Sequence, residues 1–478
     1  MRRDAANVAL GSVGKCARVT ARRFTGMSAF WVTWAGLVVS FTASGLTRFG
    51  LSVWVYQETR DAQAFALLLF FGIIPLSIGS LVAGPLVDRL DRRRVLMVSS
   101  LIARLPTLVL LLLWWQGGLA LWHIYLALVA NGLANAFVLP AYDASVRMLV
   151  PSERLGQASG FSQLIQSLGL VVGPPIAGAL LVTVGLGGIF ALDLASVALA
   201  LLALTLVRIP NPDRAADEPK DAAGIAGVWR DFVFGLRYVI ERPAFLFLSA
   251  FMAAALFAGG FTYALSGPVV LGLADEATMG LMYAAFGIGS VAGAVAIGAW
   301  GGPPRRVPAI LVATLVSGVA TALLGVRPDV VWIGVFLVLL GGSQALMLAL
   351  NRVVFQQHAA PAVLGRVFAF RMVLAMTAQA AGVVTAGSLA AHVFEPAMAP
   401  GGAWAPWLGA WIGTGEGRGA ALLMTLAGVT LVALTLAAVS SRRVRRLEDG
   451  LVGDAGARAG ATLPTRAHPA NAKNIGLK

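Results

Sequence analysis

Apolar runs of about 20 residues recur along the whole chain of 478 residues, and they constrain its fold more than any other feature. A helix of roughly 20 apolar residues is long enough to cross the hydrocarbon core of a bilayer, which is about 30 Å thick. The hydropathy pattern and its charged, Gly and Pro interruptions predict twelve such helices. They lie at residues 28–56, 65–87, 94–115, 121–142, 157–184, 189–207, 244–268, 278–301, 307–326, 330–352, 363–392 and 418–440.

The composition agrees with a polytopic, all-α membrane protein. Charged residues make up 12% of the chain, against about a quarter in soluble domains, so the chain cannot cover a soluble surface with polar groups. The net charge of +14 does not indicate a nucleic-acid partner, because the basic residues lie between the apolar runs. A single cysteine, Cys16, excludes an internal disulfide and argues against a thiol metal site.

The chain divides into two halves at its one long charged gap, residues 208–243. This linker separates six predicted helices in residues 28–207 from six in residues 244–440, and residues 1–27 and 441–478 form tails. The halves also resemble each other, since GPPIAGALL at 173–181 aligns with GVVTAGSLA at 382–390. Two related six-helix bundles predict a transporter fold with a central site between them. A chance similarity between Gly/Ala-rich helices is the alternative.

The distribution of Lys and Arg predicts the orientation. If both termini are cytoplasmic, about 30 of the 36 basic residues fall in cytoplasmic segments, as the positive-inside rule requires. Residues 1–26 lack the apolar core of a signal peptide, and Met27 stands close enough to the first helix to be the start of translation. We therefore expect a multi-pass protein of the bacterial inner membrane.

One loop carries a family resemblance. The stretch GPLVDRLDRRRVL at 84–96 links the second and third predicted helices and resembles the signature loop of the major facilitator superfamily, although Asp91 replaces its second Gly. The resemblance implies that this loop latches the two halves on the inner side, with Asp88 docking near residues 364–366. A simple basic cytoplasmic loop is the alternative. The expected inner-gate residues are Gly84, Asp88, Arg89, Arg92 and Arg93.

The fifth predicted helix, which contains GFSQLIQSLGLVVGPPIAG, is similar to the antiporter signature of exporters in the same superfamily. Small residues permit close helix packing, and a proline bends a helix. Ordinary Gly-rich packing is the alternative. The matching residues are Gly160, Gly169, Gly173, Pro174 and Gly178. The arginine that many proton-coupled exporters carry in their fourth helix is replaced here by Leu128, so the usual proton relay cannot be carried over.

Four charged residues interrupt the apolar runs: Arg48, Arg104, Arg371 and Asp193. Charges at the bilayer centre are costly, so such residues usually face a cavity or a partner. Arg48 and Asp193 lie at similar depth, and we expect them to pair or Asp193 to exchange a proton beside Arg48. Asp143 is the nearest competitor for coupling, and snorkelling of Arg48 is the alternative. Arg104 and Arg371 are expected to bind backbone or loop acids such as Asp143.

The cavity residues follow from the resemblance, which places helices one, four, seven and ten around a central path. Their inner polar side chains are few and uncharged, a lining that suits a bulky amphiphile. The cavity candidates are Asn131, Asn135, Tyr263 and Gln344.

The first helices are most similar to the branch of the superfamily that holds macrolide-efflux proteins and enterobactin-exporter-like carriers. This implies a secondary active transporter that exports a drug, secondary metabolite or siderophore by proton antiport, as a monomer and without cofactor or metal. An importer or lipid-moving carrier of the same fold is the alternative, and a sensor or scaffold would need an appended domain. No nucleotide-binding loop, paired carboxylates or clustered histidines indicate an enzyme.

Overall fold

The computed structural model describes residues 24–87, 90–151, 154, 158, 161, 165, 169, 171–207, 225–300, 302–303, 305–359 and 363–441. Within these residues, eleven helices are long and apolar enough to cross a membrane, and no β-strand is formed. The all-α membrane architecture predicted from the apolar runs is therefore confirmed.

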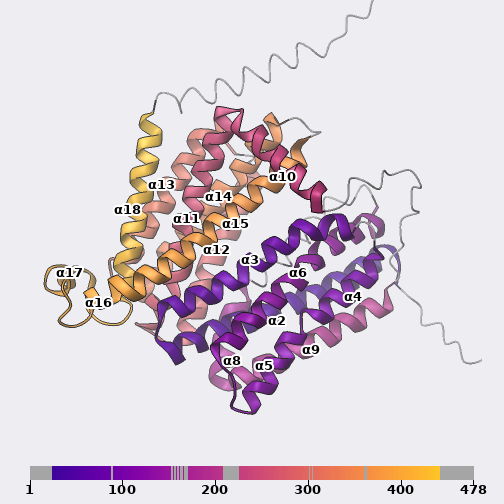
Figure 1. Ribbon diagram of the computed structural model, residues 1–478, viewed down its shortest axis with the longest axis horizontal. Helices are drawn as coiled ribbons and strands as arrows, with labels where there is room; N and C mark the ends of the chain where they lie inside the picture. The colour runs from indigo at the N-terminus through magenta and orange to yellow at the C-terminus, as the bar shows by residue number, and fades with distance from the viewer. Residues whose placement is uncertain are drawn as a thin grey trace, which may run out of the picture.

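The first half of the chain forms the helices drawn in indigo to magenta in Figure 1. They are α2 Gly26–Thr59, α3 Ala62–Val87, α4 Arg92–Ile102, α5 Leu105–Trp115, α6 Leu121–Leu149, α8 Gly173–Thr183 and α9 Gly185–Leu206. The pair α4 and α5 forms one span, residues 92–115, with a break in its middle. The fifth predicted helix is represented by the 11-residue α8, because most of residues 157–172 lie outside the described part of the chain.

The second half follows a helix in the linker, α10 Ile225–Ile240. Its helices are α11 Pro243–Leu271, α12 Glu276–Trp300, α13 Arg306–Leu324, α14 Val330–His358, α15 Leu364–Leu389, η4 Ala390–Phe394, α16 Glu395–Met398, α17 Ala405–Ile412 and α18 Arg418–Ser440. The π-helical turn η4 and α16 extend α15, so that one apolar span runs over residues 364–398. Most predicted boundaries agree within a few residues, but α6 and α14 continue by six or seven residues beyond the predicted ends at 142 and 352.

Among the described residues, the two halves share a hydrophobic core at one end of the molecule. One apolar core draws buried residues from both halves, among them Phe65 of α3 and Ala386 of α15. A second core contains residues of the linker helix and the second half alone, and a third contains residues of the first half alone. The joined end carries Arg60, and the opposite end carries Arg92; we call them the Arg60 end and the Arg92 end. Figure 1 shows the ribbons of the halves diverging from one end to the other.

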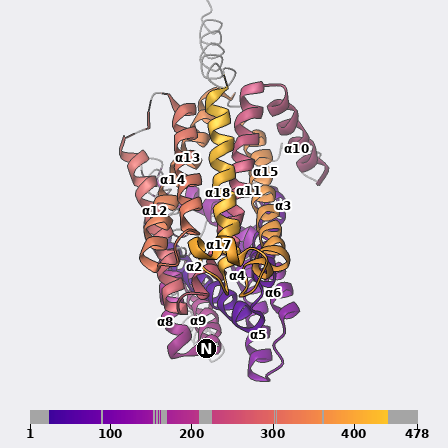
Figure 2. The same ribbon diagram turned by 90° about the vertical axis from the view of Figure 1, so that its left-hand side faces the viewer.

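Close helix crossings seal the Arg60 end. A Cβ atom placed on Gly387 of α15 would lie 2.3 Å from the Cβ of Ala66 in α3. On the other side of the interface, a Cβ on Gly280 of α12 would lie 2.5 Å from the carbonyl oxygen of Pro174 in α8. No side chain fits at either distance, so glycine is what lets these helices of different halves touch. Figure 2 shows the molecule from the Arg60 end, where α12 lies beside α8 and α15 beside α3.

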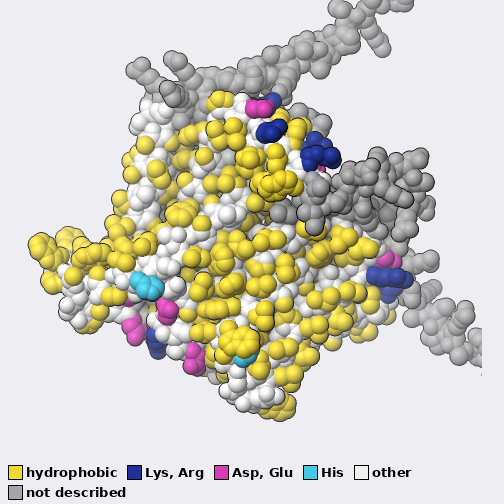
Figure 3. All heavy atoms as spheres, viewed as in Figure 1, with side chains coloured by type: hydrophobic (Ala, Val, Ile, Leu, Met, Phe, Trp, Pro, Cys, Tyr) yellow, Lys and Arg dark blue, Asp and Glu magenta, His cyan; other side chains and the backbone are white. Residues whose placement is uncertain are grey.

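Charged side chains gather at the two ends of the helices. Figure 3 shows a broad band of hydrophobic side chains between them, as expected of a surface that faces lipid. The linker helix α10 lies at the Arg92 end and packs on α15, where Asp231 forms an ion pair of 3.0 Å with Arg366. The charges of this segment predict only a linker, although its strongly amphipathic pattern, VWRDFVFGLRYVI, is typical of a surface helix.

Candidate functional site

The break between α4 and α5 places a charged side chain inside the first half. Pro106 stands at the start of α5 and has no N–H to continue the helix, so the backbone turns at Ala103 and Arg104. The side-chain amide of Asn131, on α6, donates a hydrogen bond of 2.7 Å to the carbonyl oxygen of Ala103. Asn135 in turn donates to Asn131 Oδ1 at 2.8 Å. Both asparagines, expected to line the substrate path, therefore serve at least in part to hold this break.

Arg104 forms a buried ion pair with Asp193 of α9. Its Nε lies 3.1 Å from Asp193 Oδ1, and the two residues are only 4% and 1% exposed. The other carboxylate oxygen accepts a hydrogen bond of 3.0 Å from Thr107, which follows Arg104 by one helical turn. Asp193 lies about 12 Å along α9 from its start at Gly185, by the helical rise of 1.5 Å per residue. The pair therefore sits deep between the two ends of the helices.

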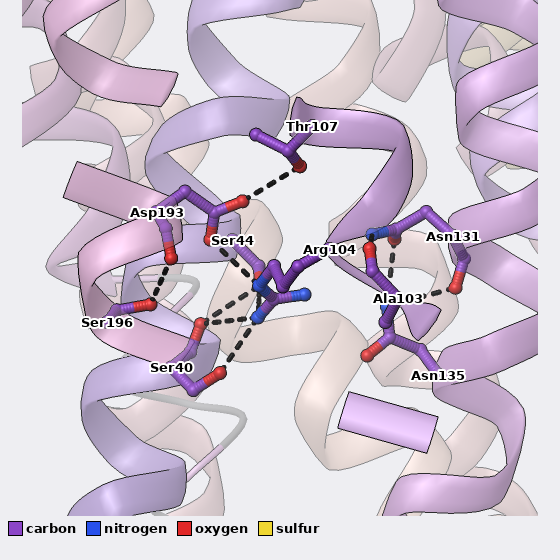
Figure 4. A network of polar contacts seen from close by, with 9 residues as sticks. All are labelled: Ser40, Ser44, Ala103, Arg104, Thr107, Asn131, Asn135, Asp193 and Ser196. Carbon is purple, nitrogen blue, oxygen red and sulfur yellow. Dashed lines mark hydrogen bonds and ion pairs between the residues drawn. The ribbon is translucent and has the colours of Figure 1, made fainter. Parts of the chain in front are cut away.

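The same arginine also holds α2. Its Nη2 donates to the hydroxyl of Ser40 at 2.8 Å, to the carbonyl oxygen of Ser40 at 3.1 Å and to the hydroxyl of Ser44. Figure 4 shows Asp193, Ser40 and Ser44 gathered around the guanidinium group of Arg104. Three helices, α2, α5 and α9, are thus tied to one guanidinium group.

This arrangement corrects two expectations about the charged residues. The partner of Asp193 is Arg104, and Arg48 makes no ion pair with it among the described residues. Arg48 is exposed and lines a cavity of about 30 Å³ together with Asp193, Leu128 and Asn131. Arg104 does bind a backbone carbonyl, as expected, but its acidic partner lies within the spans rather than at Asp143. Asp143 itself is exposed on α6.

The second half contains an uncharged counterpart of this site. A cavity of about 10 Å³ lies between α11, α13, α14 and α18 and is lined by Gln344, Ser317 and Thr321. Its side chains meet as hydroxyl pairs, with Ser317 Oγ 2.7 Å from Ser343 Oγ and Thr321 Oγ1 3.4 Å from Thr262 Oγ1. Tyr263 is partly buried in the joined core at the Arg60 end. Of the four cavity candidates, Asn131 and Gln344 thus line two different cavities, one in each half.

Arg371 of α15 binds within the second half. It donates a hydrogen bond to the side-chain oxygen of Asn351, which is fully buried in α14, and its guanidinium carbon lies 3.6 Å from the ring centre of Phe355. The expected contact between Arg371 and a loop acid such as Asp143 is therefore absent among the described residues. An amide oxygen and an aromatic face satisfy this cation instead.

The inner-gate loop is described in part. Gly84 lies in the last turn of α3, whereas Asp88 and Arg89 lie outside the described residues. Arg92 donates to the carbonyl oxygen of Ala144 at 3.1 Å. Arg93 donates to the carbonyl oxygens of Leu204 and Thr205 at 2.9 and 3.0 Å, in the last turn of α9. These two arginines thus hold neighbouring helices together through their backbone.

The glycines of the fifth helix mediate two different crossings. A Cβ atom on Gly45 of α2 would lie 2.9 Å from the carbonyl oxygen of Gly169, and Gly173 lies against the same segment of α2. Further along, a Cβ on Gly178 would lie 2.7 Å from the carbonyl oxygen of Glu276, at the start of α12 in the other half. Pro174 is buried beside Gly280 of α12. Gly160 lies outside the described residues.

Comparison with known proteins assigns the family. The family model described as Major Facilitator Superfamily matches residues 33–383, well over half of the chain. The chain belongs to the Major Facilitator Superfamily. The predicted family and fold class are therefore confirmed. The protein is a membrane transporter rather than an enzyme.

Two relatives in the superfamily share about a quarter of their residues with this chain over most of their length. The chain is 23% identical over 379 residues to the macrolide efflux protein A of Streptococcus pyogenes, covering 76% of this chain and 90% of that protein. It is 26% identical over 379 residues to the enterobactin exporter EntS of Shigella flexneri, covering 78% and 87%. The fold is similar to a bacterial homologue of the human lysosomal transporter Spinster in an inward-facing conformation, with a TM-score of 0.61, 15% identity and coverage of 89% and 98%.

The partner of Asp193 and the residues around it were not predicted from the sequence. Two signals were present. Ser40 and Ser44 are spaced four residues apart, and Arg104 and Thr107 three apart, so each pair lies on one helix face. Pro106 also marked a break beside Arg104. Neither signal says which helices face one another.

Proposed function

We propose that this protein exports a bulky amphiphilic small molecule by proton antiport, with Asp193 as the residue that takes up and releases the proton. The observation that carries the proposal is the buried pair of Asp193 and Arg104, 3.1 Å apart. A carboxylate at this depth is tolerable only when it is paired or protonated, so its two protonation states require different surroundings. The efflux activity named for the two relatives supports the direction of transport.

Protonation of Asp193 would act on the transport path through Arg104. The neutral carboxyl group no longer attracts the guanidinium, which keeps its bonds to Ser40 and Ser44 of α2. The Arg60 end of the same helix carries contacts to the other half, including the ring pair Phe49 and Tyr283, with centres 5.8 Å apart. A change at Asp193 therefore reaches, through a single helix, the surface where the two halves are joined.

The two arrangements needed for alternating access follow from the cores. In this structure the halves share a core at the Arg60 end and have separate cores at the Arg92 end. We assign the Arg60 end to the outside and the Arg92 end to the cytoplasm, because most basic residues flank the latter. The structure then represents the inward-facing state, and export requires the Arg60 end to open.

The chemistry of the helices supports an amphiphilic substrate. Trp31 is exposed on α2, and its ring packs edge-on against Trp34 and Phe161 at 5.8 and 4.7 Å between ring centres. Phe257 is partly exposed on α11 of the other half. Aromatic side chains offer large apolar area with few hydrogen-bonding demands, which suits bulky compounds better than sugars or phosphates.

The proposal extends to location and assembly. A multi-pass transporter with this charge distribution would lie in the bacterial inner membrane as a monomer, with both termini in the cytoplasm. An epitope inserted at residue 220 and one at the C-terminus should both be shielded in intact cells, and a cysteine at position 400 should react with an impermeant reagent. Labelling of the epitope at 220 from outside would show that the protein has the opposite orientation in the membrane.

The decisive experiment is transport in proteoliposomes with an imposed pH gradient, using a macrolide and enterobactin as probes. The wild-type protein should move at least one of them uphill, and nigericin should abolish this movement. Asp193→Asn should lose uphill transport and retain downhill counterflow, because Asn resembles the protonated acid. Asp143→Asn, an acid at the end of the fourth span, is the matched control and should keep uphill transport. Uphill transport by Asp193→Asn and its loss in Asp143→Asn would assign coupling to Asp143.

A further inference from the structure

A long apolar groove runs along the first half, outside the site described above. It has a volume of about 790 Å³ and lies between α3, α4 and α6 near the Arg92 end. This volume is within the range of ligand pockets. Most of the described lining residues are aliphatic or aromatic, and the charged ones among them are Asp91 and Arg94. The lining residues on which the argument depends are Leu86, Arg94, Val98, Ala130 and Leu133.

The groove faces away from the transport path. The side of α6 that lines it, with Ala130 and Leu133, continues along the helix to Leu126 and Trp122. These two residues are 60% and 62% exposed, although they lie toward the end at which the two halves are joined. A face that pointed toward the other half would be covered there. The groove therefore opens toward lipid, and acyl chains are what surrounds it.

The arginine at the groove differs from its two neighbours. Arg92 and Arg93 bind backbone carbonyl groups of α6 and α9. Arg94 has a side chain that is 86% exposed, and its Nε lies 4.0 Å from Asp91. Three arginines and one aspartate leave the segment 91–94 with a charge of +2. An exposed guanidinium at the mouth of a lipid-facing groove is complementary to a phosphate group.

We propose that this groove binds one anionic phospholipid, with an acyl chain along Val98 and Ala130 and the phosphate at Arg94. The net positive charge of the segment selects acidic over zwitterionic head groups, because anionic lipids are attracted to basic clusters at the membrane surface. The assigned orientation places the site in the cytoplasmic leaflet, where acidic lipids meet it. The binding itself depends on neither the substrate nor the proton coupling.

The test uses purified full-length protein in detergent, delipidated and then titrated with phosphatidylglycerol, phosphatidylcholine or inorganic phosphate. Native mass spectrometry counts the bound lipids, and the melting temperature reports their effect. Arg94→Gln removes the phosphate ligand, and Ala130→Trp fills the groove. The matched controls are Arg305→Gln, an exposed arginine before α13 in the other half, and Leu126→Trp, one turn along α6 outside the groove.

We expect wild type to retain one phosphatidylglycerol. Arg94→Gln should bind it about fivefold more weakly, the factor expected for one arginine at a lipid surface. Ala130→Trp should bind it no better than Arg94→Gln, because its ring occupies the groove. Both controls should bind like wild type. Equal retention of phosphatidylcholine would refute the selectivity for acidic head groups. Unchanged lipid binding by Ala130→Trp would show that the lipid does not occupy the groove. A thermal shift with inorganic phosphate equal to that with lipid would make Arg94 a simple anion site. Gel filtration confirms that each variant is folded, and a lipid effect common to all variants would also refute the site.

Discussion

Asp193 Oδ1 lies 3.1 Å from Arg104 Nε, although the two residues are 89 positions apart and belong to different helices. Asp193→Leu should therefore destabilise the protein by about 3–5 kcal/mol, because it leaves a buried guanidinium without its counter-ion. Asp193→Asn should cost less, since its amide oxygen can still accept a hydrogen bond from Thr107. Thermal unfolding in detergent, together with abundance in the membrane, measures both effects.

The control for this pair distinguishes its two possible cations. The double variant Arg104→Leu, Asp193→Leu should recover most of the stability, because replacing both members of a buried pair by apolar groups is often nearly neutral. Arg48→Leu should have little effect alone and should not rescue Asp193→Leu, since Arg48 is exposed. Rescue by Arg48→Leu instead would mean that Arg48 is the counter-ion in the membrane.

The Arg60 end carries a charged bridge between the halves. Arg60 Nη1, just after α2, lies 3.1 Å from Glu416 Oε2, just before α18, and both side chains are more than half exposed. An exposed ion pair contributes about 0–1 kcal/mol to stability. We therefore expect it to shift the equilibrium between the closed and open Arg60 end without affecting folding. Glu416→Arg should raise the open fraction several-fold by repulsion, and Arg60→Glu added to it should reverse the change. Double electron–electron resonance between labels on α2 and α12 measures the opening, and identical distances in all variants would contradict the role of the bridge.

Gly178 is predicted to be essential for closure of the same end. A Leu side chain there would collide with the carbonyl oxygen of Glu276 in α12, since even a Cβ atom would lie 2.7 Å from it. Gly178→Leu should hold the Arg60 end apart and reduce transport at least about tenfold, because overpacking at this contact costs about 1–3 kcal/mol. Gly72→Leu is the control, since no atom lies within 4 Å of its new Cβ. The two variants should be inserted into the membrane in equal amounts. Transport by Gly178→Leu at the wild-type rate would show that α8 and α12 can move apart enough to accommodate the side chain.

At the Arg92 end, an ion pair engages a residue that is expected to take part in closure. Arg366, where Asp88 is expected to dock when this end closes, is bound here by Asp231 of the linker helix at 3.0 Å. Asp231→Asn should favour closure of the Arg92 end about two- to fivefold by releasing Arg366, given the small energy of exposed pairs. Asp88→Asn should have the opposite effect and cripple transport without reducing insertion. Cysteine accessibility at the Arg92 end measures both, and accessibility that neither variant changes would rule out competition for Arg366.

Several parts of the structure were predictable because they depend on short stretches of chain. Apolar length predicts a membrane helix wherever it occurs, so the spans from Gly26–Thr59 to Arg418–Ser440 were expected within a few residues. The ends of α6 and α14 were not predicted, because a helix can continue beyond the hydrocarbon core into polar residues that hydropathy does not count as part of a span. The linker helix α10 was missed for the related reason that an amphipathic surface helix has no long apolar run.

The sequence by itself determined the all-α membrane class, the approximate limits of most apolar helices, and the requirement that Asp193 have a partner. Each follows from local hydropathy or from the cost of one buried charge. Only the tertiary structure decided that the partner is Arg104, because Arg48 and Arg104 satisfy the same local rules. The choice depends on the break at Pro106, which turns Arg104 toward α2 and α9, and on the packing of helices far apart in the chain. The closed Arg60 end is likewise a property of contacts between halves, which no single stretch of sequence contains.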